Sequence, residues 1–263
     1  MKDSRDWIFI AGHHKSGTTL LQSILRDHPD ISGFRNTGVP GDEGQHLQSI
    51  IKPASFYGGP GRYIFDLACH LTEQHPLATK QTARILENQW LPYHDVSKHV
   101  LLEKSPPNLV RTRFLQSLFP RCKFLVILRH PIAVAYATRK VSDASLDSLL
   151  AHTLLGYDVF YRDLPYLHYC HIVRYEDLMM NFELQIRTIL DFLALDYRRD
   201  SVLPKVVNKD TSYFKRWELE RGNLLPKQTR YIINSIAPRS KEIGYGGYTD
   251  QSNGYYLANM KKI

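Results

Sequence analysis

The sequence has few cysteines and no long tract of positive charge. Its three cysteines, Cys69, Cys122 and Cys170, lack the spacing of metal ligands, and their odd number argues against a disulfide framework. The formal net charge of +8 predicts an anionic partner, which could be nucleic acid, an acidic membrane surface or a multiply charged small molecule. Because no run of about five or more lysines and arginines occurs, we expect no nucleic-acid partner.

The sequence also lacks an apolar segment of about 20 residues, the length that crosses a membrane. Its first residues, MKDSRDW, are charged and contain no apolar core of a signal peptide. From these absences we expect a cytoplasmic protein with reduced thiols and no membrane partner. No linker-like or repetitive segment divides the chain, so we predict one domain over residues 1–263.

Short apolar runs alternate with helical patterns along the chain. This alternation predicts an α/β fold, in which a central parallel sheet of about five strands is flanked by helices. The run FLVIL is typical of a central strand that is buried on both faces, and apolar residues at helical spacing predict helices after the first strand and over 184–195. The expected strands cover residues 7–12, 30–34, 99–104, 122–129 and 168–175.

The loop after the first expected strand has the form of a phosphate-binding loop. In GHHKSGTT, Gly12 and Gly17 are separated by four residues, as in a P-loop, and a helical pattern follows. Glycines let backbone amides turn inward, and the N-terminus of the helix adds partial positive charge. We therefore predict an anion site in this loop. Its expected residues are Lys15, Ser16, Gly17, Thr18 and Thr19.

The lysine of this loop is displaced from the position that ATP and GTP enzymes use. Their lysine directly follows the second glycine, where this chain has Thr18, whereas Lys15 precedes Gly17 by two residues. The strand expected at 122–129 ends in Arg129 rather than in a magnesium-binding carboxylate. An arginine there would repel a metal ion and attract a second phosphate. The alternative is an arginine that caps the strand and pairs with a surface carboxylate.

The two motifs together resemble those of a known enzyme family. KSGTT (15–19) near the start and RHP (129–131) after an apolar strand resemble the sulfotransferases that use 3′-phosphoadenosine 5′-phosphosulfate (PAPS). The segments EKSPPN (103–108) and RYEDL (174–178) also follow family patterns, so the resemblance runs from about Trp7 to Tyr245. It implies a P-loop-like fold, PAPS as the co-substrate, 3′-phosphoadenosine 5′-phosphate (PAP) as the product, and no metal.

The resemblance also implies which residues bind the donor. The first loop would bind the 5′-phosphosulfate, Arg129 would bind the 3′-phosphate, and Tyr175 would stack on adenine. Many members have a serine eight residues after the arginine as a second 3′-phosphate ligand, but here that residue is Ala137. Thr138, beside it, is the candidate substitute. Further candidates, on a basic segment near the C-terminus, are Lys215 and Arg216.

The chemistry implied is in-line transfer of a sulfuryl group from PAPS to a hydroxyl or amine of a small-molecule or glycan-like acceptor. Lys15 would stabilise the leaving phosphate oxygen. A general base is also needed. Glu43 is the first candidate and His46 the second, and their spacing of three puts them on one face if a helix begins there. Glu103 and Lys104, at the end of the third expected strand, could also face the sulfuryl group, with Lys104 as a candidate second cation.

Two other interpretations stay open at this point. A P-loop kinase of unusual form would need a lysine that reaches the γ-phosphate and an acidic magnesium ligand, and neither has its usual place here. A non-catalytic nucleotide-binding protein of the same fold is consistent with Ala137, although the intact Lys15 loop argues against it. The sequence leaves the acceptor and the oligomeric state undetermined, and we expect acceptor walls from the loops 36–63 and 139–165.

Overall fold

A computed structural model describes residues 5–197, 210–221, 227, 234–235, 238–239 and 243–245. Its centre is a parallel sheet of five strands in the order β2-β3-β1-β4-β5. Every strand coincides, within one or two residues, with a segment expected from the sequence, so the predicted α/β fold is confirmed. The strands are β1 (Asp6–Ala11), β2 (Ile31–Gly33), β3 (Val100–Lys104), β4 (Lys123–Leu128) and β5 (Cys170–Arg174).

Strand β1 lies in the middle of the sheet, between β3 and β4. Its residue Ile10 is paired with Lys104 of β3 and with Leu125 of β4. Because the three strands are parallel, their carboxyl ends meet at one edge of the sheet. The segments that follow them start there, and ligands of open α/β sheets bind at this edge.

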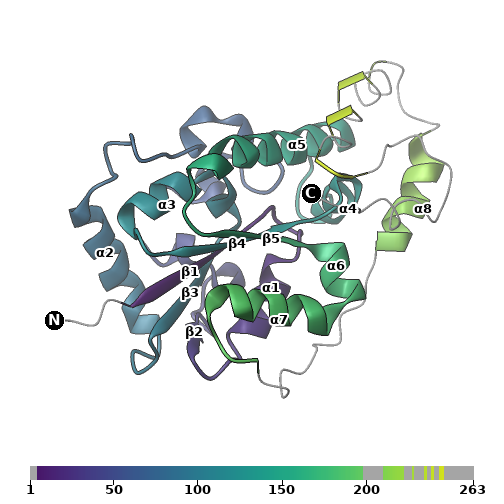
Figure 1. Cartoon of the computed structure of the whole chain (residues 1–263). Helices are drawn as coiled ribbons and strands as arrows, with labels where there is room; N and C mark the ends of the chain where they lie inside the picture. The colour runs from purple at the N-terminus through teal and green to yellow at the C-terminus, as the bar shows by residue number, and fades with distance from the viewer. Residues whose placement is uncertain are drawn as a thin grey trace.

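Helices cover both faces of the sheet (Figure 1). On one face lie α1 (Thr18–Leu25), α6 (Tyr175–Met180) and α7 (Phe182–Leu193), and on the other α3 (Thr112–Leu118), α4 (Pro131–Thr138) and α5 (Leu146–Asp163). Alternate residues of β1 supply the two cores: Ile8 and Ile10 pack with the first group of helices, Trp7 and Phe9 with the second. Helices α1 and α7 confirm the predictions made from apolar spacing.

The connection from β2 to β3 consists largely of short 3₁₀ turns, followed by α2 (Lys80–Trp90). Glu43 lies between the turns Pro40–Asp42 and Gly44–His46, so the region does not begin an α-helix. The glycine- and proline-rich segment around Ala54–Tyr57 is irregular, as expected, and its role as an acceptor wall stays a prediction. Across the described residues, none of the helices combines the length and apolar character needed to span a lipid bilayer.

Candidate active site

The loop after β1 borders a cavity of about 500 Å³ at the carboxyl edge of the sheet. Gly17 has a φ of 110°, in a region that favours glycine, and a Cβ there would lie 2.7 Å from Cδ2 of Tyr175. A larger residue therefore fits neither the turn nor the packing at this position. Helix α1 begins at Thr18, directly after the turn, so its unpaired N-terminal amides lie at the cavity.

Lys15 is at the tip of this loop, and its exposed side chain borders the cavity. Its backbone has a φ of 67°, a left-handed conformation that costs a residue with a side chain on the order of 1 kcal/mol. Ser16 does not border the cavity. It is buried, and its Oγ donates a hydrogen bond of 2.8 Å to the carbonyl of His13, which closes the turn.

Two histidines precede Lys15, and both are neutral at pH 7. Burial lowers the pKa of His13 to about 4 and that of His14 to about 3, with neighbouring cations adding to the effect on His14. His13 donates from Nε2 to the carbonyl of Thr153 at 2.8 Å, which ties the loop to α5. The cationic group at the loop tip is therefore Lys15, and the histidines contribute packing and orientation.

Arg129 follows β4 and is 7% exposed. Its Nε donates to Oδ1 of Asp210 at 3.1 Å, Nη2 donates to the same carboxylate, and Nη1 donates to the carbonyl of Lys15 at 2.7 Å. Asp210 is the first residue of α8 (Asp210–Arg221). The arginine thus has a carboxylate partner, as the alternative interpretation expected, but that carboxylate is buried rather than on the surface.

Two tyrosines fix the position of Arg129. The hydroxyl of Tyr157, on α5, accepts a hydrogen bond from the backbone N–H of Arg129 at 3.0 Å and donates one to its carbonyl at 2.8 Å. The ring of Tyr175 lies 4.1 Å from the guanidinium carbon and also packs against Gly17. This location supports a role for Tyr175 in positioning the guanidinium, while its stacking on adenine stays a prediction.

The residues after Arg129 place a second cation beside it. Ala137 borders the cavity, together with Lys140 and Tyr213, and Lys140 donates from Nζ to the Tyr213 hydroxyl at 3.1 Å. Thr138, the predicted substitute ligand, is buried and borders a separate small cavity near His152. Lys140 was not among the residues predicted from the sequence, and because it lies in the turn after α4 no helical spacing pointed to it.

The two C-terminal candidates lie on α8 with exposed side chains. Neither Lys215 nor Arg216 is among the residues that border the cavity, and Arg216 donates from Nε to Glu220 at 2.5 Å. Tyr213, on the same helix, does border it. Helix α8 therefore contributes Tyr213 and Asp210 to the site. Roles for Lys215 and Arg216 stay predictions.

Lys104 is 61 positions from Glu43 in the sequence, yet it lies together with Glu43 and His46 at the end of β3. Lys104 has no exposed surface, and its Nζ lies 2.9 Å from Oε1 of Glu43 and donates to the carbonyl of Gly41 at 2.9 Å. Oε2 of Glu43 accepts a hydrogen bond from Nε2 of Gln45 and lies 3.8 Å from Nε2 of His46. Glu43 also borders the cavity, so the base candidate and the phosphate loop face the same space.

A second carboxyl group lies beneath this cluster. Glu103 is 1% exposed and accepts hydrogen bonds from Ser105 Oγ at 2.5 Å and from Asn108 Nδ2 at 2.6 Å. Burial raises its pKa to about 7. Gly44 packs directly on this group, because a Cβ there would lie 2.5 Å from Glu103 Oε1.

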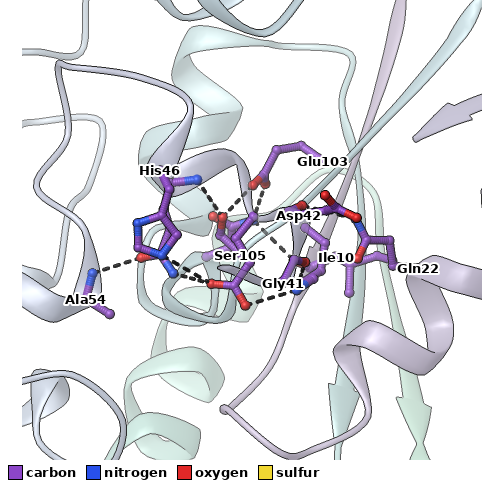
Figure 2. Close-up of polar contacts among 12 residues, drawn as sticks. Ile10, Gln22, Gly41, Asp42, His46, Ala54, Glu103 and Ser105 are labelled. Carbon is purple, nitrogen blue, oxygen red and sulfur yellow. Dashed lines mark hydrogen bonds and ion pairs between the residues drawn. The ribbon is translucent and has the colours of Figure 1, made fainter. Parts of the chain in front are cut away.

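Gln45 links the cluster to the glycine-rich segment. Its backbone N–H donates to Ser105 Oγ at 2.9 Å, and its side-chain oxygen accepts from the N–H of Ala54 at 2.8 Å. Figure 2 shows His46, Ser105 and Glu103 gathered at the sheet edge, with Ala54 on the neighbouring segment. Gln45 was not among the site residues predicted from the sequence, whereas Glu103 was named as a group at the end of the third expected strand.

The described part of the chain contains no group of three or more His, Cys, Asp or Glu side chains that could hold a metal ion. A larger cavity, of about 760 Å³, lies at the opposite edge of the sheet, near Arg5, His99 and Cys122. It contains none of the predicted site residues, so the smaller cavity is the candidate active site.

The model of the sulfotransferase family matches residues 6–199. The chain therefore belongs to the sulfotransferase family, which confirms the resemblance carried by the KSGTT and RHP motifs. The match covers all five strands and the cavity residues from the first loop to Tyr175.

Among curated proteins, the chain is similar to protein-tyrosine sulfotransferases. It is 28% identical over 273 residues to protein-tyrosine sulfotransferase 2 of Gallus gallus, covering 94% of this chain and 71% of the relative. It is also 28% identical over 204 residues to protein-tyrosine sulfotransferase 1 of Danio rerio, covering 74% of this chain and 55% of that protein. The match thus spans little more than half of the length of the Danio rerio relative.

Solved structures share the fold. The sulfotransferase domain of the Synechococcus PCC 7002 olefin synthase aligns with a TM-score of 0.55 and 17% identity, covering 92% of this chain and 94% of that one. The sulfotransferase domain of the curacin biosynthetic pathway aligns with a TM-score of 0.51 and 16% identity, covering 90% and 95%. At this identity the similarity establishes the fold and leaves the acceptor undetermined.

Proposed function

We propose that this protein transfers a sulfuryl group from PAPS to a hydroxyl or amine of an acceptor. The observation that carries the proposal is one cavity of about 500 Å³ that is bordered by the phosphate loop, Arg129 and Glu43. Its volume is in the range of small-molecule sites. Two candidate anion-binding groups and a candidate base thus border the same cavity, which supports their acting on one ligand.

The residues present fit the donor nucleotide. The amides near Gly17, Thr18 and Thr19 would hold the 5′-phosphosulfate at the N-terminus of α1. Arg129 and Lys140 would hold the 3′-phosphate, with Lys140 in place of the hydroxyl that Ala137 lacks. The bound donor supplies the sulfuryl group and a phosphate leaving group.

Catalysis would then depend on charge and position. Lys15, exposed at the loop tip, stabilises negative charge on the leaving oxygen. Glu43 accepts the proton of the acceptor hydroxyl, and Lys104 holds Glu43 in place and adds positive charge near the reacting groups. His46 is the second candidate for the base.

We propose a small-molecule or glycan-like acceptor, and the names of the similar proteins add the tyrosine hydroxyl of polypeptides as a second acceptor class to test. Most of 139–165 is helix α5 rather than the expected loop, so the segment 36–63 and the turn before α5 are the walls that would select among these acceptors. The cytoplasmic location and the single domain over residues 1–263 stay predictions.

Calorimetric titration followed by an acceptor screen tests this function. PAP should bind without magnesium, and ATP should bind poorly with or without it. Labelled PAPS should then transfer its label to one of three acceptor sets: alcohols and phenols, amino sugars and glycans, or tyrosine peptides. Tighter binding of ATP that requires magnesium would instead support the kinase interpretation. Binding of PAP without transfer to any acceptor would support a nucleotide-binding protein.

A further inference from the structure

The guanidinium of Arg129 is already bound by a carboxylate. Asp210 accepts hydrogen bonds from Nε and Nη2, and the carbonyl of Lys15 accepts one from Nη1, so each guanidinium nitrogen has an acceptor. The Nε and Nη2 edge is the one that binds two oxygens of an anion side by side. A phosphate that uses this edge has to replace Asp210.

We propose that Asp210 competes with the 3′-phosphate of the nucleotide for Arg129. In the free protein its carboxylate neutralises the buried guanidinium, and in the complex the phosphate takes its place. This inference rests on the proposed function, because it assumes that Arg129 binds the 3′-phosphate. Its consequence is that Asp210 weakens the binding of every nucleotide that carries a 3′-phosphate.

Such competition has a use in the reaction cycle. PAPS and PAP carry the same 3′-phosphate, so contacts to it stabilise substrate and product equally and do not speed the chemical step. A tight contact to this group would slow the release of PAP. A carboxylate that returns to Arg129 lowers the affinity for PAP and increases its rate of release.

Asp210 is not needed to hold α8 in place. The helix packs on α4 through Tyr213 and Trp217, which are both buried, and the ring of Tyr213 stacks at 6.3 Å on that of Tyr136. Glu220, near the other end of α8, accepts hydrogen bonds from Arg139 at 2.8 Å and from Tyr136 at 3.0 Å. A substitution at Asp210 should therefore remove the competing charge and leave the helix docked.

The test is the affinity of Asp210→Asn for PAP and for 5′-AMP, which lacks the 3′-phosphate. The dissociation constant for PAP should fall by about tenfold or more, because an uncharged amide oxygen competes for the guanidinium more weakly than a carboxylate does. The dissociation rate of PAP should fall by a similar factor, and the affinity for AMP should not change. Glu218→Gln, on the same helix and paired with Arg221, is the matched control and should leave both affinities unchanged.

A double-mutant cycle makes the test specific. In an Arg129→Ala background, Asp210→Asn should no longer alter PAP affinity, because the residue for which the two anions compete is absent. Asp210→Ser, which keeps a good N-terminal helix residue, serves as a second variant if Asp210→Asn fails to fold.

Three results would overturn the inference: unchanged or weaker PAP binding in the folded Asp210 variants, an equal gain for AMP, or a gain that persists without Arg129. In each of these cases wild-type protein still binds PAP, so the proposed function survives. Wild-type protein that binds no PAP contradicts the proposed function itself.

Discussion

The cavity has two halves that are built in different ways. The donor half consists of the loop 12–19, Arg129 and Lys140, and it presents cations and backbone amides to the cavity. The proposed acceptor half consists of Glu43, Gln45, Glu103 and Lys104: Glu43 is paired with Lys104 and Gln45, and Glu103 accepts hydrogen bonds from Ser105 and Asn108. The donor half thus offers two exposed lysines and loop amides to an anion while Arg129 is held by Asp210, whereas the acceptor half is a hydrogen-bonded network with one carboxylate at the cavity.

This difference predicts how each half responds to substitution. Loss of Lys15 or Lys140 removes charge from the cavity and leaves the fold intact, because both side chains are exposed, whereas Arg129 is buried and paired with Asp210. Loss of an acceptor-half group leaves buried partners unpaired, which is expensive for a buried charge such as Lys104. Conservative variants that keep shape and hydrogen bonds are therefore the informative ones in the acceptor half.

We expect the largest loss of turnover on substitution of Glu43, because this residue is the candidate base. Glu43→Gln keeps an oxygen for Lys104 but cannot accept a proton, so turnover should fall by about 10²- to 10⁴-fold while PAP binding is unchanged. Turnover with labelled PAPS and calorimetry with PAP measure the two quantities. His46→Gln is the paired variant and should lose far less turnover. A greater loss in His46→Gln would assign the base to His46.

Substitutions in the donor half should affect PAP binding and turnover separately. Lys15→Ala should lower turnover by about 10²- to 10³-fold, because it removes a charge that acts on the leaving oxygen, and should change PAP affinity only slightly. Arg129→Ala should mainly weaken PAP binding, since the 3′-phosphate is remote from the reacting bond. Initial rates and PAP titrations of both variants are the measurement. Unchanged turnover in Lys15→Ala would show that Lys15 does not stabilise the leaving oxygen.

The same contrast explains what the sequence could predict. The phosphate loop is a local motif in which strand, glycines and helix follow one another, so it was found from the residues, as were the five strands. The acceptor half depends on a contact between Glu43 and Lys104, 61 positions apart, inside a segment of 3₁₀ turns that has no periodic signal. Asp210 reaches Arg129 over 81 positions, and only the folded chain determines that pairing.

A buried carboxyl group with a raised pKa lies in the acceptor half and another lies beside the donor half, and both make the stability of the protein depend on pH. Burial raises the pKa of Glu103 to about 7, and it does the same for Glu176, which accepts a hydrogen bond from the N–H of His130 beside Arg129. In the unfolded chain both groups have ordinary values near 4.5. Between about pH 4.5 and 7 the folded protein keeps protons that the unfolded chain releases, so these groups make the free energy of unfolding fall as pH rises.

The smallest effect we predict is the change in this pH dependence. Glu103→Gln mimics the protonated acid, so relative to wild type its free energy of unfolding should rise between pH 4.5 and 7 and stay up to about 3 kcal/mol higher at pH 8. Urea unfolding at several pH values measures the difference. Glu176→Gln should do the same for the donor half. Glu73→Gln is the control of opposite sign: Arg113 lowers the pKa of Glu73, so this variant should be less stable than wild type above pH 4.5, and the difference should shrink as pH falls below that value. Parallel curves for Glu103→Gln and wild type would mean that Glu103 is ionised in the folded protein, and that the acceptor half carries two negative charges against Lys104.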